Sequence, residues 1–380
     1  MHLSLANFRN YGHLELDFPP HVMVLQGDNA QGKTNLLEAL HLLATARSHR
    51  ATNERELLNW SAARQGLEVT RLAARIEKSS GTVDVELALM GVASKAEEAT
   101  TASGVPEVRL VQKRIKVNGI NRRAIDLVGQ VNVVLFSSQD IDLVAGSPSM
   151  RRRYLDLANS QVNSRYLRTL QQYNKVVTQR NHLLRMIGER RAQCDQLDFW
   201  DEQLVEQGSY LVESRQTMMA ELDSLARPIH DRLTSNRETL RLQYLPSVAS
   251  ADFQDRLRQA RQRELAQGMT VVGPHRDNIA FLVDNADMNT YGSRGQQRTV
   301  ALSLRLAETE FMHARTGDAP ILLLDDVLSE LDATRRQHVL DFVTAHQQVV
   351  LTTTDLDWLT PAFLDRASLL RVAQGTVSPG

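Results

Sequence analysis

The chain has 380 residues, 42% of them hydrophobic and 23% charged, which is an ordinary composition for a globular protein. Its formal net charge is −1, so composition alone gives no sign of a nucleic-acid partner. No apolar run reaches the ~18 residues of a membrane span, no signal-peptide pattern opens the chain, and the only cysteine is Cys194. These features exclude an internal disulfide and a cysteine-built zinc site, and we expect a cytoplasmic protein.

The N-terminal part of the chain is expected to combine short strands with one helix. Apolar runs and period-two alternation predict the strands, and Asn118-Gly119 predicts a tight hairpin turn. A helix is expected from Lys33, because leucines follow it at helical spacing, and residues 92–106 are expected to form a loop. The expected strands are Leu3–Phe8, Leu14–Phe18, Val22–Gln26, residues 67–77 and 82–90, Val108–Val117, Ile120–Ile125 and Val131–Phe136.

The middle of the chain is expected to be mostly helical, from Ser147-Pro148 to about Ala266. Two apolar stripes at helical spacing, one from Leu155 to Val177 and one from Leu197 to Leu225, are separated by residues 188–196. This arrangement predicts an antiparallel pair of helices rather than a long coiled coil.

The C-terminal part returns to a mixture of strands and helices. Strands are expected at Leu240–Leu245 and Ile279–Val283, and helices alternate with strands from Ser293 onwards. We therefore expect an α/β head formed by residues 1–147 and 267–380, interrupted by a helical insertion at residues 148–266.

A candidate phosphate-binding loop lies between the third expected strand and the helix at Lys33. The stretch fits the pattern G-x-x-x-x-G-K-[ST] in the strand–loop–helix context that this motif requires. Backbone N–H groups of such a loop surround phosphate oxygens, Lys33 reaches the β- and γ-phosphates, and the Thr34 hydroxyl binds Mg²⁺. The loop consists of Gly27, Asp28, Asn29, Ala30, Gln31, Gly32, Lys33 and Thr34.

Three further motifs occur near the C-terminal end. Asp325 and Asp326 end an apolar strand; beside a P-loop, the first carboxylate is placed to hold Mg²⁺ and the second to polarise an attacking water. Lys33 and this pair are therefore the expected catalytic residues. Small residues open a helix just before the strand, where backbone N–H groups are exposed to an anion. The flanking motifs are Ser293-Arg294-Gly295-Gln296 before the strand and Ser329-Glu330-Leu331-Asp332 after it.

Taken together, the motifs resemble those of the RecF family of SMC-like, ABC-type ATPases. Ser293, Arg294, Gly295 and Gln296 are similar to the ABC signature, and Ser329 and Asp332 to the D-loop. Gln139 is similar to the Q-loop glutamine, and this resemblance adds it to the expected catalytic residues. The resemblance extends from end to end of the chain. Its most specific segments are Asn7–Tyr11, Gly27–Leu40, Gly273–Asp277, Ser293–Thr299 and Leu322–Asp332.

The resemblance implies an α/β fold, namely a P-loop ABC-type ATPase head with mixed sheets around the P-loop helix and an inserted, mainly helical second domain. It implies ATP and Mg²⁺ as cofactors, a weak ATPase activity, and a homodimer that forms on ATP. Each nucleotide would lie between one protomer's P-loop and its partner's signature. Thr34 and Asp325 would bind the metal. Arg9 and Asn35 would add contacts to ATP, although Arg9 could equally pair with an acid.

The resemblance also implies binding to DNA, both duplex and gapped, and cooperation with RecR and RecO in loading RecA. Nearly all positive charge is arginine, whose planar group suits contacts to phosphate. Arg151, Arg152 and Arg153 are the candidates for DNA contacts. The alternative is that they form a solvated helix face paired with acids.

Some positions depart from the general ABC pattern or have an ordinary structural explanation. Asp326 stands where transporters usually carry Glu, so hydrolysis is expected to be slow. Thr354 and Asp355 stand where a switch histidine is usual, and either is a candidate γ-phosphate sensor. His275 is expected to be a hydrogen-bonded turn residue.

Two other functions would use the same motifs. One is the ATPase subunit of a membrane transporter, against which the helical insertion and the segments Gly273–Asp277 and Ser293–Thr299 argue. The other is an SMC-like clamp with vestigial hydrolysis, which an ATPase measurement with and without DNA would reveal.

Overall fold

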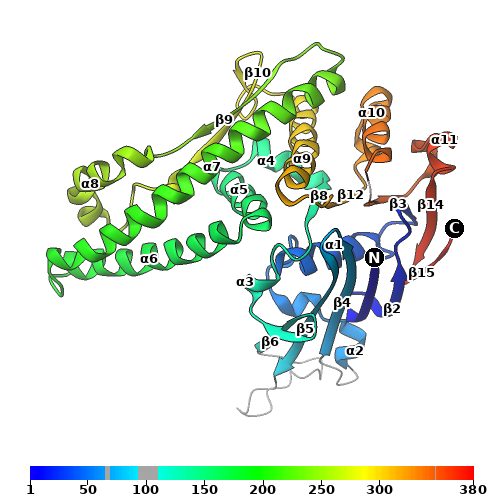
Figure 1. Cartoon of the computed structure of the whole chain (residues 1–380), viewed down its shortest axis with the longest axis horizontal. Helices are drawn as coiled ribbons and strands as arrows, with labels where there is room; N and C mark the ends of the chain where they lie inside the picture. Colours follow the sequence, from blue (N-terminus) through cyan, green and yellow to red (C-terminus); the bar gives the residue numbers. More distant parts are fainter. Residues whose placement is uncertain (65–68, 93–109, 347) are drawn as a thin grey trace. The chain divides into compact units, whose positions relative to one another are not determined.

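The computed structural model describes residues 1–64, 69–92, 110–346 and 348–380 (Figure 1). The chain forms two compact units, one made of Met1–Ser138 and Met312–Gly380 and the other of Gln139–Phe311. The loop expected at residues 92–106 lies almost wholly outside the described residues. No helix in the described ranges is long and apolar enough to cross a membrane.

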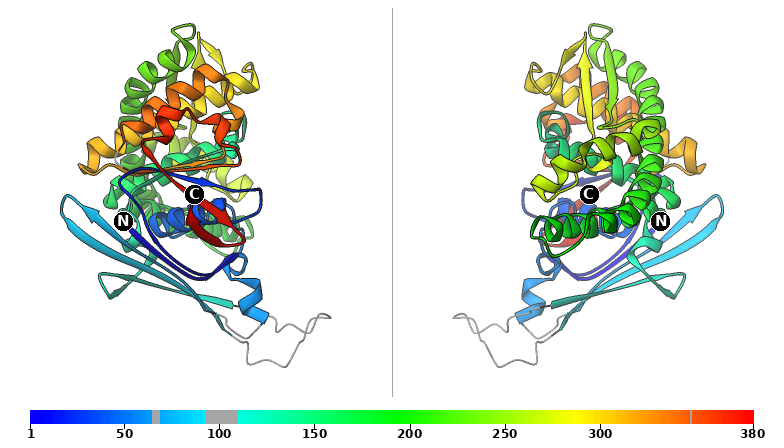
Figure 2. Two further views of the ribbon diagram at one scale, coloured as in Figure 1. Left: turned by 90° about the vertical axis from the view of Figure 1, so that its right-hand side faces the viewer. Right: turned by 90° about the vertical axis from the view of Figure 1, so that its left-hand side faces the viewer.

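The first unit contains an antiparallel sheet in the order β2-β1-β4-β5-β6-β7. Burial alternates along β4, which is typical of a sheet with one face on the core and the other in solvent. Figure 2 shows the long strands β4, β5 and β6 as neighbours in this sheet. The strands are β1 (His2–Phe8), β2 (Tyr11–Asp17), β4 (Val69–Lys78), β5 (Gly81–Val92), β6 (Leu110–Val117) and β7 (Ile120–Arg122).

The strand expected at Ile120–Ile125 is too long, and this prediction is wrong beyond β7. The short helix α3 (Ala124–Leu127) begins instead, because the Asp126 carboxylate accepts a hydrogen bond from the backbone N–H of Arg123 at 3.2 Å. A second short helix, α2 (Trp60–Arg64), precedes β4.

The second sheet of this unit has the order β15-β14-β3-β13-β12-β8 and is parallel except for the β14–β15 hairpin. Its central strands are buried along nearly their whole length, as expected when both faces of a parallel sheet are covered. The carboxyl ends of β3, β12 and β13 therefore meet at one edge. The strands are β3 (His21–Gln26), β8 (Val133–Ser137), β12 (Ile321–Asp325), β13 (Gln348–Thr353), β14 (Ala367–Ala373) and β15 (Thr376–Pro379).

Helix α1 (Lys33–Thr45) contributes its leucines to one core shared with residues of both sheets. Eleven of its side chains are buried, among them the charged Lys33 and Glu38. The P-loop helix is thus held from two sides, which fixes the loop at its N-terminus. Helices α10 (Ala333–Thr344) and α11 (Pro361–Leu364) complete the unit.

The second unit is mainly helical. Helices α6 and α7 pack side by side, which agrees with the expected helical pair (Figure 1). A core of aromatic and leucine side chains lies between them and α8. The helices of this unit are α4 (Ile141–Ala145), α5 (Pro148–Val162), α6 (Ser164–Gly188), α7 (Leu197–Thr234), α8 (Phe253–Gln267) and α9 (Arg294–Thr316), whose last turns belong to the first unit.

The apolar stripe from Leu155 to Val177 belongs to two helices, not one. Asn163 separates α5 from α6; its backbone is extended, and its side chain accepts a hydrogen bond from the Tyr166 N–H at 2.9 Å. This residue therefore caps a new helix rather than continuing the old one.

A small antiparallel sheet in the order β11-β10-β9 also belongs to the second unit. Strand β9 packs on α7, and β10 packs on α5, so this sheet and most of α9 group with the helices. The division into compact units thus differs from the boundaries expected at residues 147 and 266. The assignment of residues 148–266 as an insertion into an ATPase head remains a prediction. The strands are β9 (Leu240–Leu245), β10 (Asn278–Val283) and β11 (Ala286–Asp287).

Candidate nucleotide site

Two glycines of the P-loop are required by its conformation. A Cβ atom on Gly27 would lie 2.3 Å from the carbonyl oxygen of Val372. At Gly32 the backbone φ is +120°, and a Cβ atom would lie 2.6 Å from Nδ2 of Asn10. Ala30 also has a positive φ of 63°. This value lies in the left-handed region, where a residue other than glycine has a strained backbone. The loop is therefore tightly curved against β14 and against the turn between β1 and β2.

Side chains from the turn between β1 and β2 support this loop. Asn10 Nδ2 donates to the carbonyl oxygen of Gln31 at 2.8 Å, and the Tyr11 hydroxyl donates to that of Gly32 at 3.0 Å. Asn35 Nδ2 in turn donates to Asn10 Oδ1 at 2.8 Å. The side chain of Asn35 thus joins this support, and its expected contact to ATP stays a prediction. The roles of Asn10 and Tyr11 did not follow from the sequence, although both lie in one of the segments that carried the resemblance.

The β14–β15 turn holds the loop from another direction. The backbone N–H of Gly375 donates to the Gln31 carbonyl at 3.0 Å, and that of Gln374 donates to Gln31 Oε1 at 2.7 Å. A Cβ atom on Gly375 would lie 2.2 Å from the carbonyl oxygen of Asn10, so the turn requires glycine there. Gln31 is thus fixed at both its backbone and its side chain, while Asp28 and Asn29 are exposed.

Lys33 lies within the loop. Its Nζ donates to the carbonyl oxygens of Gly27 at 2.5 Å and Asp28 at 2.9 Å. Burial lowers the pKa of Lys33, and the nearby carboxylates of Asp326 and Asp325 oppose that shift. The ammonium group is therefore positioned where the motif requires a cation for the β- and γ-phosphates.

The two expected metal-binding groups contact each other. The Thr34 hydroxyl donates to Asp325 Oδ1 at 3.0 Å, across 291 positions of sequence. Thr352 Oγ1, on β13, donates to the same oxygen at 2.9 Å. In the described part of the chain no group of three or more His, Cys, Asp or Glu side chains could hold a metal. A hydroxyl and one carboxylate fit Mg²⁺, which usually takes one or two protein ligands beside water and phosphate oxygens.

Asp326 has a strained backbone beside this pair. Its φ is +53°, and its N–H donates to Thr352 Oγ1 at 3.0 Å. Burial raises the pKa of Asp326, and the neighbouring Asp325 acts in the same direction while Lys33 opposes it. A carboxylate with a raised pKa is a stronger general base. Thr352 was missed from the sequence, where its signal was a polar residue at the end of an apolar strand.

Arg9 pairs with an acid, which was one of the two roles expected for it. Its Nε and NH2 groups donate to both carboxylate oxygens of Glu38 at 2.9 and 2.8 Å, and its NH1 donates to the Glu56 carbonyl at 2.6 Å. The Glu38 side chain is fully buried, in α1. Burial alone would raise the pKa of Glu38, but the hydrogen bonds from Arg9 and Ser48 outweigh it and lower the pKa. An ATP contact of Arg9 stays a prediction.

The expected signature residues open helix α9 in the second unit. The Ser293 N–H donates to Gln296 Oε1 at 3.1 Å, and the Gln296 N–H donates to Ser293 Oγ at 3.3 Å, which is a reciprocal capping box. Ser293, Arg294 and Gly295 are exposed. A Cβ atom on Gly295 would have no neighbour closer than 4.0 Å, so this glycine is not required by packing.

The remaining candidates follow the carboxyl ends of strands. The Ser329 hydroxyl donates to the Asp326 carbonyl at 2.8 Å, and Asp332 caps α10 by accepting from the Arg335 N–H at 2.8 Å. The Asp355 N–H donates to Thr353 Oγ1 at 3.2 Å, directly after β13. Thr354, between these two residues, is half-buried. The D-loop candidates and both sensor candidates thus follow strands whose ends lie at the P-loop edge.

Gln139 is exposed and belongs to the second unit. It follows β8 by two positions, and the last residue of β8, Ser137, is the register partner of Asp325.

Arg151 is buried rather than exposed at the helix surface. Its guanidinium donates to Asn278 Oδ1 at 2.8 Å and to the Val144 carbonyl at 3.0 Å. Arg152 is half-buried and donates to the Asp277 carbonyl at 2.9 Å, whereas Arg153 is exposed. The guanidinium of Arg151 is therefore already bound within the protein, and Arg153 is the fully exposed residue of this cluster.

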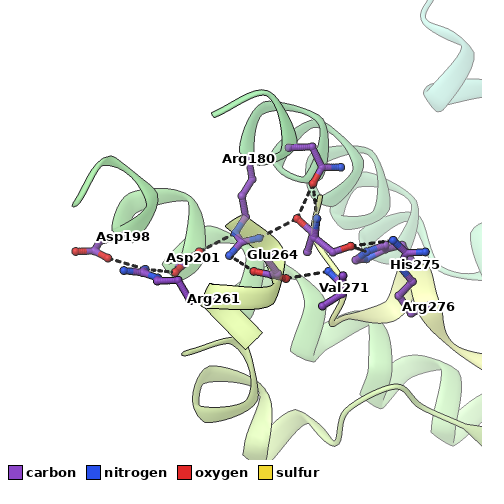
Figure 3. A network of polar contacts seen from close by, with 10 residues as sticks. Arg180, Asp198, Asp201, Arg261, Glu264, Val271, His275 and Arg276 are labelled. Atoms are coloured by element: carbon purple, nitrogen blue, oxygen red, sulfur yellow. Dashed lines mark hydrogen bonds and ion pairs between the residues drawn. The ribbon is translucent and has the colours of Figure 1, made fainter. Parts of the chain in front are cut away.

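His275 is a hydrogen-bonded turn residue, as expected. Its Nε2 donates to the Thr270 carbonyl at 3.1 Å, so Nδ1 accepts from the Tyr173 hydroxyl at 2.6 Å. Burial lowers the pKa of His275 to about 4, which keeps it neutral. Figure 3 shows the surrounding network, in which the buried Arg180 joins Asp201 and Glu264 at 2.7 and 2.6 Å. The segment Gly273–Asp277 is thus a structural junction of the second unit.

Comparisons with known proteins agree with this geometry. The chain matches the family model of the RecF/RecN/SMC N-terminal domain over residues 1–377. It is 44% identical over 385 aligned residues to the DNA replication and repair protein RecF of Herpetosiphon aurantiacus, covering 99% of this chain and 98% of that protein. It is 43% identical over 398 aligned residues to RecF of Roseiflexus castenholzii, covering 100% and 99%.

Two solved structures are similar in fold to this chain. The recombination mediator protein RecF-ATP in the RecFOR pathway is similar with a TM-score of 0.84 and 30% identity, covering 100% of this chain and 96% of that one. An SMC head bound to the C-winged helix domain of ScpA is similar in fold alone, with a TM-score of 0.56 and 14% identity over 99% and 95%.

The mixed sheets around the P-loop helix, together with these similarities, define an ABC-type ATPase head of the SMC class. The alternative function, the ATPase subunit of a membrane transporter, is therefore wrong. The chain belongs to the RecF family of bacterial DNA replication and repair proteins.

Proposed function

We propose that this protein is an ATP-dependent DNA-binding protein of recombinational gap repair, which dimerises on ATP and hydrolyses it slowly. The observation that carries the proposal is the contact between Thr34 and Asp325, made beside Lys33. These are the groups that a P-loop ATPase uses to hold Mg²⁺ and the terminal phosphates. A relative that is 44% identical is a DNA replication and repair protein, and a similar solved structure is of RecF with ATP.

Nucleotide binding would depend on one protomer's own loop. The N-terminal N–H groups of α1 lack acceptors within the helix and favour an anion. Lys33 would exchange its carbonyl partners for phosphate oxygens, and Thr34 and Asp325 would share Mg²⁺. The metal would neutralise charge that develops on the phosphate during transfer.

Hydrolysis would use Asp326 as the base that orients and polarises water. Its raised pKa suits that role. Aspartate is one methylene shorter than the glutamate of ABC transporters, so its reach toward the water is reduced and turnover would be slow.

Dimerisation would bring a second protomer's signature to this nucleotide. Ser293 and Gly295 are exposed at the start of a long helix, where backbone N–H groups and a hydroxyl favour an anion. A C₂ dimer would use the same pair of surfaces twice and form two composite sites.

DNA binding and partner binding are the finer parts of the proposal. The substrate would be duplex DNA and its junction with a single-stranded gap, and the protein would act in the bacterial cytoplasm with RecR, and with RecO and RecA downstream. Among the candidate arginines, Arg153 is the exposed one that would contact phosphate.

A gel-shift series over single-stranded, duplex and gapped DNA, with and without ATP, tests the proposal. We expect ATP to increase the affinity for duplex and gapped DNA. ATPase activity should be measurable with the wild type and lost in Lys33→Met. If DNA affinity does not depend on ATP and no ATP turnover is measured, the protein is better described as a clamp with vestigial hydrolysis.

A further inference from the structure

Glu238 contacts the signature glutamine from outside helix α9. It lies in the loop of residues 235–239 that joins α7 to β9, and its side chain is 19% exposed. Gln296 Nε2 donates to Glu238 Oε1 at 3.0 Å. The other carboxylate oxygen lies 3.4 Å from Nε2 of His230, on the last turns of α7. Sequence motifs gave no role to this glutamate.

The carboxylate determines which way the Gln296 amide points. A carboxylate can only accept hydrogen bonds, so the NH₂ group of Gln296 must face Glu238. The amide oxygen is then directed to the Ser293 N–H, from which it accepts at 3.1 Å. With the opposite orientation, an NH₂ group would face the Ser293 N–H, and both are donors.

The same arrangement leaves the Ser293 hydroxyl proton available. Ser293 Oγ accepts from the Gln296 N–H at 3.3 Å, and this bond uses a lone pair and not the hydroxyl hydrogen. The serine can therefore keep its capping bond and donate its proton to an anion at the same time. An intact capping box is what holds Ser293 in that position.

The loop that carries Glu238 is itself fixed. The Asn236 N–H donates to the Asp231 carbonyl at 2.7 Å, which closes the end of α7. The Thr239 N–H donates to Asp284 Oδ1 at 3.1 Å, and Asp284 lies in the tight turn between β10 and β11. Glu238 thus lies between Asn236 and Thr239, whose backbone N–H groups are both hydrogen-bonded.

Helix α7 is tied to α9 a short distance away. His230 Nδ1 lies 3.0 Å from Ser303 Oγ, and the Ser303 hydroxyl donates to the Thr299 carbonyl within α9. His230 and Glu238 together therefore connect the end of α7 to the first three turns of the signature helix.

We propose that Glu238 is a positioning residue of the signature motif, which orients the Gln296 amide and so presents the Ser293 hydroxyl to the partner's nucleotide. This inference rests on the proposed function for its effect on hydrolysis. Its structural part, the orientation of the capping box, does not depend on that function.

The test compares Glu238→Ala with Glu238→Gln and with the control Glu213→Ala. A glutamine can still accept from Gln296, but its own amide can also turn, so partial rescue is expected. Glu213 lies on α7 in the same unit and accepts from the Ser250 hydroxyl at 2.9 Å, far along the helix from the signature. Thermal unfolding of each variant checks that it is folded.

Amide hydrogen exchange of the peptide covering residues 291–300 gives the first readout. Glu238→Ala should speed exchange at Ser293 and Gln296 about 10-fold, since a lost hydrogen bond to a charged group corresponds to roughly that factor or more. Glu238→Gln should lie between Ala and wild type, and Glu213→Ala should match wild type. Unchanged exchange in Glu238→Ala would overturn the inference, whatever the fate of the proposed function.

ATP binding and turnover give the second readout. Glu238→Ala should bind ATP with an affinity within about twofold of wild type, because its P-loop is untouched, while kcat falls about 10-fold. Glu238→Gln should recover part of the turnover. A wild type without turnover would contradict the proposed function alone, whereas wild-type turnover in Glu238→Ala would contradict the positioning role.

Discussion

Replacing Tyr11 by phenylalanine tests whether the β1–β2 turn supports the P-loop. The Tyr11 hydroxyl donates to the Gly32 carbonyl, and the ring is fully buried. Burial raises the pKa of Tyr11, so the hydroxyl remains a donor at neutral pH. The substitution removes one hydrogen bond and leaves the ring in place.

The size of the effect follows from what the Gly32 carbonyl keeps. It still accepts from the Leu36 N–H at 3.1 Å, so it is not left unsatisfied. The loss should therefore be near the net value of one hydrogen bond, about 1 kcal/mol, rather than the larger value for an orphaned group. If that free energy holds the loop in its binding conformation, the Kd for ATP should rise up to about fivefold.

The assay is a titration with fluorescent ATP combined with thermal unfolding. Tyr210→Phe is the matched control, because it makes the same chemical change at a tyrosine that accepts from Asn163 in the second unit. It should leave the Kd for ATP unchanged. If Tyr11→Phe alters neither the Kd for ATP nor the melting temperature, the turn does not support the loop.

Three further predictions concern the base, a buried histidine and the arginines. Asp326→Asn should keep ATP binding and slow hydrolysis about 10² to 10⁴-fold; because the pKa of Asp326 is raised, wild-type turnover should fall with decreasing pH through a value above that of an ordinary aspartate. The pKa of His275 is lowered to about 4, so the folded chain binds a proton at this residue more weakly than the unfolded chain does. The free energy of unfolding should therefore fall by about 3 kcal/mol as the pH drops from 7 through 4. In urea titrations, His275→Gln should reduce this dependence of stability on pH. Arg153→Glu should weaken all DNA forms alike and flatten the salt dependence of binding, whereas Arg151→Ala should lower stability because its buried hydrogen bonds are lost. Full DNA affinity in Arg153→Glu would show that this arginine is only a solvated charge.

Much of the site could be predicted from the sequence because its motifs are local. The P-loop lies between a strand and a helix that each have clear periodicity, and Asp325 ends an apolar strand. The parallel sheet then brings Thr34 and Asp325 together, since carboxyl ends of parallel strands share an edge.

The residues that support the loop could not be found in the same way. Asn10, Tyr11 and Gly375 donate hydrogen bonds to backbone carbonyls of the loop, and such contacts leave no pattern in the side chains of the loop. Burial of Arg151 was equally hidden, because a run of arginines on a helix has the same sequence whether it faces solvent or a neighbouring element.

The predicted helix boundaries were wrong for a different reason. The apolar stripe continues in phase across Asn163, so periodicity could not detect the break between α5 and α6. The signal was the capping preference of asparagine, which outweighed continuity of the stripe.

Complementation between two inactive variants shows whether the nucleotide site is shared between protomers. Lys33→Met should lose ATP binding, because the loop loses its cation. Ser293→Arg should bind ATP with its own Lys33 and Thr34, but the long side chain should block dimerisation with ATP and abolish hydrolysis. Size-exclusion chromatography with light scattering shows the dimer, and a phosphate-release assay shows turnover.

A mixture of the two variants can form one complete site in each heterodimer, from the P-loop of the Ser293→Arg protomer and the signature of its Lys33→Met partner. Neither variant should form an ATP-bound homodimer, and each heterodimer holds one working site of two, so at most about half of wild-type turnover should return. We expect turnover to be recovered in the mixture and to be absent in either variant alone. A dimer that still forms with ATP in Ser293→Arg alone, or a mixture that stays inactive while both variants remain folded, would contradict a site shared between protomers.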